Sequence, residues 1–209
     1  MDGEFMKIKV VIAGGTGFVG QGIIEQLLPE KFEVHSLSRH PHQGEAGDQT
    51  IYHAVDLARP QEWQSIVHDA DWVIDAVGIL LPNPLKKQTY QNSSYAPAKN
   101  IMDVLVNEPK VKFLFISANA GPFFMKPYLK AKRAVEQDMQ QRLAEQAYLV
   151  YPGIIFDKAR FSSYLPGLVL AQLTILPYFR KLRPLSRTQF SREIERMLLG
   201  QKSPLEQRL

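Results

Sequence analysis

Hydrophobic and polar positions along the chain follow two patterns that predict strands and helices in alternation. Short runs that are apolar at nearly every position are typical of strands buried on both faces of a parallel sheet. Longer segments with apolar residues three or four positions apart predict amphipathic helices. The expected strands cover 7–13, 32–38, 50–56, 71–80, 111–118 and 147–156, and the expected helices cover 18–29, 60–69, 90–107 and 127–146.

This alternation predicts an α/β fold with a doubly wound parallel sheet, the Rossmann fold. It covers residues 6–157, and Pro97 puts the firm start of the third helix near residue 96. Residues 158–209 are expected to form a small helical, substrate-side region of the same domain. Residues 1–5 resemble an expression scar and are left out of the fold prediction.

Composition narrows the classes of function. The chain of 209 residues suits one domain, and its net charge of +4 is a mild excess without the interleaved aromatic residues of a nucleic-acid surface, so no nucleic-acid partner is expected. It contains no cysteine, which excludes a thiol nucleophile and cysteine-ligated zinc and suits a reducing, cytoplasmic location. The apolar stretch 164–179 is too short to span a membrane, although contact with a membrane surface stays open as the less favoured alternative. The oligomeric state is left open.

A glycine-rich turn follows the first expected strand directly and opens the first expected helix. The segment "AGGTGFVG" at 13–20 allows two spacings, because either Gly14 or Gly15 can begin a triplet with Gly17 and Gly20. A strand, a glycine turn and a helix N-terminus together form a cradle for a pyrophosphate. A mononucleotide P-loop is excluded because Gln21, rather than a lysine, follows Gly20. The predicted cradle consists of Gly14, Gly15, Thr16, Gly17, Phe18, Val19 and Gly20.

The end of the second strand bears on the choice of dinucleotide. An acidic residue there commonly binds the ribose 2′-hydroxyl of NAD. This chain has Ser38 and Arg39 at that point, and no acid follows before Glu45. An arginine can hold a 2′-phosphate through two parallel hydrogen bonds. The sequence therefore favours NADP, with NAD as the alternative.

Tyr-x-x-x-Lys on a helix places a phenol and an ammonium group one turn apart, where the lysine can lower the tyrosine pKa and the tyrosine can exchange a proton with substrate. The spacing occurs twice, as Tyr95 with Lys99 and as Tyr128 with Lys132. We select Tyr128 and Lys132 because they follow the fifth strand on a helix that starts with proline. At the end of that strand, Ser117 is expected to orient a substrate oxygen.

Together, the wider triplet of Gly14, Gly17 and Gly20, the basic end of the second strand, and Ser117 with the Tyr128–Lys132 pair resemble the short-chain dehydrogenase/reductase superfamily. The likeness is to its atypical and extended branches, which include NmrA-like proteins and relatives of a complex I accessory subunit. The resemblance gives Lys132 a second role at the nicotinamide ribose. It implies further cofactor contacts by Asp56 and Leu57 near the adenine, by Ala76, Val77 and Gly78 along the cofactor, and by Tyr151, Pro152 and Gly153 near the nicotinamide.

The sequence also departs from this family. Ala13 replaces the threonine usual before the first glycine, and Tyr151 replaces an arginine common before the strand-six proline. The interval from Ser117 to Tyr128 is short, and Asn119 is an alternative to the serine. An asparagine usual in the fourth helix of that family would be Asn92, within the expected helix 90–107, only after a shift of register.

These observations favour an NADP(H)-dependent oxidoreductase that reduces a carbonyl or oxidises an alcohol of a small or apolar substrate. The alternative is a non-catalytic, cofactor-binding redox sensor or assembly factor. A sugar-nucleotide epimerase is less favoured because the C-terminal region is small. No metal site is expected, because His40 and His42, with Glu45 and Asp48 nearby, lie in a polar loop without a closed set of ligands.

Overall fold

The structure is a computed structural model that describes residues 6–79, 82–83, 85, 88–121, 125–157 and 184–208. Its centre is a sheet of six parallel strands in the order β3-β2-β1-β4-β5-β6. This is the doubly wound order of the dinucleotide-binding fold, and the predicted fold class is therefore confirmed. The strands are β1 (Ile8–Ala13), β2 (Phe32–Ser38), β3 (Ile51–Ala54), β4 (Trp72–Asp75), β5 (Lys112–Ile116) and β6 (Ala147–Val150).

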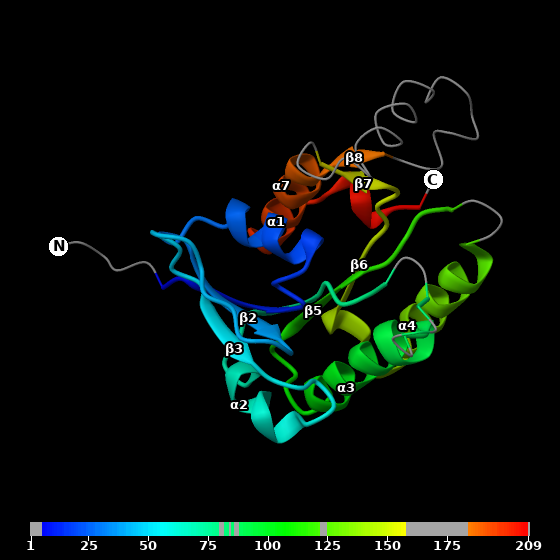
Figure 1. Ribbon diagram of the computed structural model, residues 1–209, viewed down its shortest axis with the longest axis horizontal. Helices are drawn as coiled ribbons and strands as arrows, with labels where there is room; N and C mark the ends of the chain where they lie inside the picture. The colour runs from blue at the N-terminus through cyan, green and yellow to red at the C-terminus, as the bar shows by residue number, and fades with distance from the viewer. Residues whose placement is uncertain are drawn as a thin grey trace.

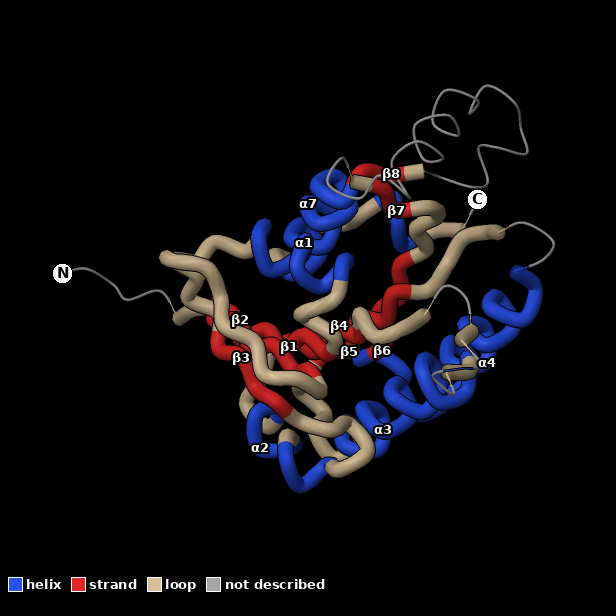
Figure 2. The backbone as a smooth tube through the Cα atoms, in the orientation of Figure 1, coloured by secondary structure: helices blue, strands red, loops and turns tan. Residues whose placement is uncertain are grey.

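Helices cover both faces of the sheet (Figures 1 and 2). One face carries α2 (Gln64–Val67), α3 (Ala96–Leu105) and α4 (Lys126–Leu143). The other carries α1 (Phe18–Gln26) and α7 (Arg187–Leu198), beside which β7 (Ile155–Phe156) pairs with β8 (Leu185–Ser186). Successive side chains of a strand point to opposite faces, so each strand contributes to both cores.

Each core is built from one set of alternating strand positions and the helices above it. On the α3 and α4 face, Val73, Phe113 and Phe115 pack with Met102 and Val135. On the α1 face, Ile12, Ile74 and Leu114 pack with Ile23 and with Phe190 of α7. Residues 187–198 therefore build the core of the domain. The substrate-side role expected of 158–209 stays a prediction, since residues 158–183 lie outside the described part.

Several elements are shorter than their apolar patterns indicate. β4 ends at Asp75 and β6 at Val150, because the chain turns out of the sheet where a site would be expected in this fold. The predicted helix at 60–69 is divided into a 3₁₀ turn at Pro60–Glu62 and the single turn α2, with fully buried Trp63 between them. A π-helical turn at Gln91–Tyr95 leads into α3, which begins at residue 96 as predicted.

No helix in the described part of the chain has the length and apolar character needed to cross a bilayer. The apolar stretch 164–179 lies outside the described residues.

Candidate functional site

The glycine turn joins β1 to α1, and its backbone geometry requires glycine at two positions, Gly14 and Gly20. Gly14 has a φ of +79°, in the left-handed region that favours glycine. A Cβ on Gly20 would lie 2.4 Å from the Gly14 carbonyl oxygen, so the helix packs directly on the turn. Gly17 caps α1 and donates its N–H to the Gly14 oxygen at 3.0 Å. The turn thus brings the backbone N–H groups of a helix N-terminus to an open end of the sheet, which fits a pyrophosphate.

The turn after β4 lies against the glycine turn. A Cβ on Gly14 would be 3.1 Å from the Ala76 carbonyl group and from the Val77 nitrogen. The Ala76 N–H also donates to the Ala13 oxygen at 2.9 Å. Gly78, two residues after Ala76, lies near the selected lysine, because a Cβ on it would be 3.8 Å from Lys132 Nζ. The structure therefore brings the residues selected at 76–78 between the glycine turn and the selected lysine.

Arg39 follows the carboxyl end of β2 and lines a cavity of about 420 Å³, together with Ala54, Val55, Asp56, Arg59 and Glu62. The β2 end is held by the Ser38 oxygen, which accepts the Val55 N–H at 2.8 Å. Arg59 is neutralised by Glu62 at 2.7 Å and Asp56 at 3.6 Å. Arg39 makes no ion pair or hydrogen bond with another described residue. It is thus a cation without a protein counter-ion in the described part of the cavity.

At this cavity, the sequence pointed to Leu57 as a cofactor contact but did not point to Arg59. Leu57 packs on the core below the cavity and does not line it. Arg59 was missed by the sequence analysis, although its spacing to Asp56 and Glu62 is the ion-pair spacing of one helical turn.

Lys132 is almost fully buried at the carboxyl end of β5. Its Nζ donates to the Ile116 oxygen at 2.7 Å and lies 4.4 Å from the centre of the Phe115 ring. The Tyr128 ring lies one helical turn away, with its centre 5.9 Å from the same nitrogen. The structure therefore brings the selected tyrosine and lysine to the same end of the site.

The electrostatics of this pair differ from the expectation. Burial lowers the pKa of Lys132 to about 8, although the negative charges of Asp75 and Glu136 oppose that shift. Burial also raises the pKa of Tyr128 to about 12, and the neighbouring Tyr90 adds to the rise. The predicted lowering of the Tyr128 pKa is therefore wrong for this structure, because desolvation of the phenolate outweighs the opposing charge of Arg133.

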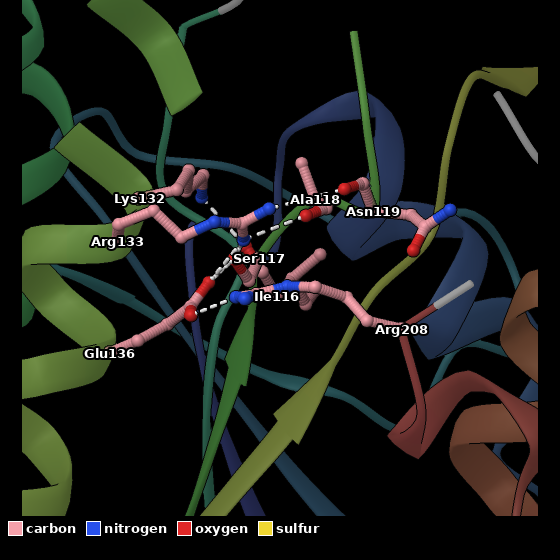
Figure 3. A network of polar contacts seen from close by, with 8 residues as sticks. All are labelled: Ile116, Ser117, Ala118, Asn119, Lys132, Arg133, Glu136 and Arg208. Carbon is pink, nitrogen blue, oxygen red and sulfur yellow. Dashed lines mark hydrogen bonds and ion pairs between the residues drawn. The ribbon is translucent and has the colours of Figure 1, made fainter. Parts of the chain in front are cut away.

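Ser117 is part of a buried polar network rather than an isolated hydroxyl (Figure 3). Its Oγ donates to Glu136 of α4, whose carboxylate also binds Arg133 at 2.7 Å and Arg208 near the C-terminus. Arg133 further donates to the Ala118 and Asn119 oxygens at 2.9 and 3.1 Å. The network fixes the loop after β5. The expected role of Ser117 toward substrate stays a prediction.

The segment after β6 joins the same region. The Pro152 oxygen accepts the Asn119 N–H at 2.8 Å, which ties residues 151–153 to the end of β5. The Arg208 guanidinium lies 4.5 Å from the centre of the Tyr151 ring, and the Tyr151 N–H donates to the Leu205 oxygen. Tyr151, Pro152 and Gly153 therefore follow β6 beside Ser117. Arg208 was not found from sequence because its contacts are with residues far away along the chain.

The second Tyr-x-x-x-Lys pair has other partners. Tyr95 donates to Asp138 at 3.3 Å, and Lys99 binds Asp103 at 2.7 Å on the exposed side of α3. Asn92 is exposed and accepts the Thr89 N–H. The buried polar residue beside Gly78 is instead Ser94, whose Oγ would be 3.5 Å from a Cβ on that glycine. Sequence reasoning missed Ser94 because the π-helical turn alters the helical register.

The polar loop weighed as a metal site has local contacts of its own. Asp48 accepts hydrogen bonds from the Thr50 N–H and the Tyr52 hydroxyl. The His42 ring lies edge-on to Tyr52, with 4.6 Å between the ring centres. Among the described residues, no three histidine, aspartate or glutamate side chains gather in a way that could hold a metal ion.

The chain is similar in sequence and in fold to known NAD(P)H-binding proteins and dehydrogenases. Residues 14–164 match the model of a family described as NAD(P)H-binding. MIOREX complex component 2 of Saccharomyces cerevisiae is 26% identical, over 73% of this chain and 74% of its own length. The oxidoreductase ylbE of Lactococcus lactis has the same fold, with a TM-score of 0.69 and 15% identity over 92% of this chain and 85% of its own. A short-chain type dehydrogenase/reductase of Mycobacterium ulcerans gives a TM-score of 0.67 and 17% identity over 93% and 84% of the two chains.

Proposed function

Because this chain belongs to the NAD(P)H-binding family, we propose that it is an NADP(H)-dependent oxidoreductase of the short-chain dehydrogenase/reductase type that reduces a carbonyl group. The single observation that carries the choice of cofactor is Arg39, a cation that lines the cavity at the end of β2 and has no counter-ion among the described residues. A 2′-phosphate would satisfy its guanidinium through charge-assisted hydrogen bonds. The lack of cysteine suits the reducing cytoplasm for such a protein.

The glycine turn fits the rest of the dinucleotide. The N-terminus of α1 would hold the pyrophosphate, residues 76–78 would lie along the cofactor, and Lys132 would bind the nicotinamide ribose. NADPH supplies a hydride when bound. These assignments use the backbone contacts between Gly14 and Ala76 and the proximity of Gly78 to Lys132 Nζ.

Tyr128 would donate the proton that the substrate oxygen needs, and Lys132 would stabilise the charge that this leaves. Once a hydride is supplied to the substrate carbonyl carbon, the carbonyl oxygen would take the proton of the Tyr128 hydroxyl, which would leave an alcohol and a tyrosinate that solvent reprotonates. A pKa of about 12 keeps Tyr128 in the protonated, donating form at neutral pH, which favours the reductive direction. Lys132, with its Nζ 5.9 Å from the ring centre, stabilises the negative charge that forms on the oxygen.

A non-catalytic role is the second candidate, as a cofactor-binding sensor or assembly factor. It is favoured by Ser117, whose hydroxyl donates to Glu136 instead of being held for a substrate. The similarity to a protein named as a component of the MIOREX complex points the same way. Tight NADPH binding without turnover of any carbonyl in a broad panel would support this candidate over the enzyme.

Arg39→Ala tests the choice of cofactor. The variant should lose one or more charge-assisted hydrogen bonds to the 2′-phosphate, each typically about 1.5–3 kcal/mol, and NADPH should bind about 10–100-fold more weakly. NADH has no 2′-phosphate, so its affinity should change less than about threefold. Fluorescence titration with each nucleotide measures both effects.

Arg192→Ala is the matched control, since it removes the same charge from an exposed position on α7. It should leave both affinities unchanged. An equal loss of NADPH and NADH affinity in Arg39→Ala would show that the arginine does not read the 2′-phosphate.

A further inference from the structure

Asp75 is a buried carboxylate that the mechanism above leaves without a role. It is the last residue of β4, and its side chain is about 1% exposed. Oδ1 accepts the Val77 N–H at 2.9 Å, whereas Oδ2 has no hydrogen-bond partner within the described part of the chain. A buried carboxylate with one unpartnered oxygen is costly, so an opposite charge nearby is expected to offset it.

Lys132 lies on the same face of the sheet. Asp75 of β4 pairs with Phe115 of β5 in the sheet register, and the Lys132 Nζ lies 4.4 Å from the centre of the Phe115 ring. The ammonium group also borders Gly78, which follows Asp75 by three residues. The positive charge of Lys132 lowers the pKa of Asp75, against the larger rise that burial causes.

The other carboxylate near Lys132 is already neutralised. Glu136 binds both Arg133 and Arg208 and accepts the Ser117 hydroxyl (Figure 3). Asp75 has no such arginine partner within the described residues. The titratable and charged groups around the lysine are Asp75 from β4, Tyr128, Arg133 and Glu136 from α4, Tyr90 before α3, and Arg208 near the C-terminus.

We propose that Asp75 is the counter-ion that keeps Lys132 protonated in its buried position, and is thus a positioning residue for the cofactor and for Tyr128. Its effect on cofactor binding rests on the function proposed above, whereas its effect on the charge of Lys132 does not. Without Asp75, an ammonium group placed between an aromatic ring and a carbonyl oxygen would lose its proton more readily.

The pKa values of Asp75 and Lys132 set the pH range in which both groups are charged. Burial raises the pKa of Asp75 to about 6 and lowers that of Lys132 to about 8. Below the first value Asp75 is neutral, and above the second Lys132 is neutral. Both groups are charged between these two values, around neutral pH.

Nitrogen NMR of the lysine side chains tests the proposal without any cofactor. The Lys132 Nζ signal is assigned by its loss in Lys132→Arg, and its pKa is measured in wild type, Asp75→Asn and Glu136→Gln. Asp75→Asn should lower the pKa of Lys132 by about one unit or more, a tenfold loss of proton affinity. Glu136→Gln should lower it less, because the glutamate charge is already compensated by two arginines.

An unchanged pKa of Lys132 in folded Asp75→Asn, or a larger shift in Glu136→Gln, would overturn the proposal. If Asp75→Asn does not fold, the wild type decides, because interacting groups titrate together. The Lys132 Nζ signal should then show a step at the pH where the Asp75 carboxyl carbon titrates, and its absence would reject the pairing.

A second readout tests the consequence for the cofactor. The affinity of Asp75→Asn for NADPH should begin to fall with rising pH about one unit earlier than that of the wild type. If the wild type binds no NADPH at any pH, the proposed function fails, while the NMR result still decides whether Asp75 is the counter-ion. If NADPH binds and the two pH profiles coincide, the positioning role is rejected.

Discussion

Replacing Tyr128 with phenylalanine is expected to lower the rate of carbonyl reduction by about 10²–10⁴-fold, the usual contribution of a general acid. Phenylalanine keeps the ring beside Tyr90 and within reach of Lys132 but removes the proton that the substrate oxygen would take. The affinity for NADPH should stay within about twofold of wild type, since the phenol hydroxyl is assigned to the substrate. Single-turnover oxidation of NADPH, followed by absorbance, separates these two effects.

Tyr95→Phe is the matched control for this substitution. Tyr95 belongs to the second Tyr-x-x-x-Lys pair and donates to Asp138 away from the glycine turn. Its loss should leave the rate of reduction near that of the wild type. A Tyr128→Phe protein that reduces substrate at the wild-type rate would remove the phenol from the mechanism.

Replacing Gly20 with alanine should weaken binding of the dinucleotide by about 100-fold or more. The added Cβ would lie 2.4 Å from the Gly14 oxygen and 2.6 Å from the Gly15 Cα, which are backbone atoms that can yield only if α1 moves away from the turn. Overpacking of this kind costs about 1–3 kcal/mol of stability. Displacing two backbone donors from a pyrophosphate, at about 1.5 kcal/mol or more each, weakens binding by at least about 100-fold. Thermal unfolding and nucleotide titration measure the two losses.

Gly22→Ala provides the comparison on the same helix. A Cβ on Gly22 would lie 2.5 Å from Cγ of Arg187 on α7, rather than against the backbone of the turn. The variant should keep its affinity for the dinucleotide within about threefold of wild type, because its clash lies between α1 and α7 and leaves the backbone of the turn in place. Wild-type affinity in Gly20→Ala would contradict the assignment of the turn as the pyrophosphate cradle.

The sequence predicted most of the fold because its strands are short apolar runs bounded by polar residues. β2 spans 32–38 as predicted, since charged and turn residues flank it on both sides. β4 was predicted too long because the residues after Asp75 continue the apolar run, and apolar residues in a turn look like residues in a buried strand. The end of β4 is set by the contact of the following turn with Gly14, and this contact forms only when the chain folds.

The candidate site was predictable where function depends on local spacing. The glycine turn and the pair of Tyr128 and Lys132 are local patterns, and the structure brings them to the same end of the sheet. The neighbours that set their electrostatics were not predictable. Asp75 and Arg208 act across the fold, and the pKa of Tyr128 depends on burial that no spacing along the chain reveals.

The central claim is that the glycine turn and Arg39 together hold NADPH, and a side-by-side titration of the wild-type protein with NADPH and NADH tests it most directly. NADPH should bind at least about tenfold more tightly, as expected for one additional charge-assisted contact to the 2′-phosphate. Equal and weak binding of both nucleotides would contradict the account.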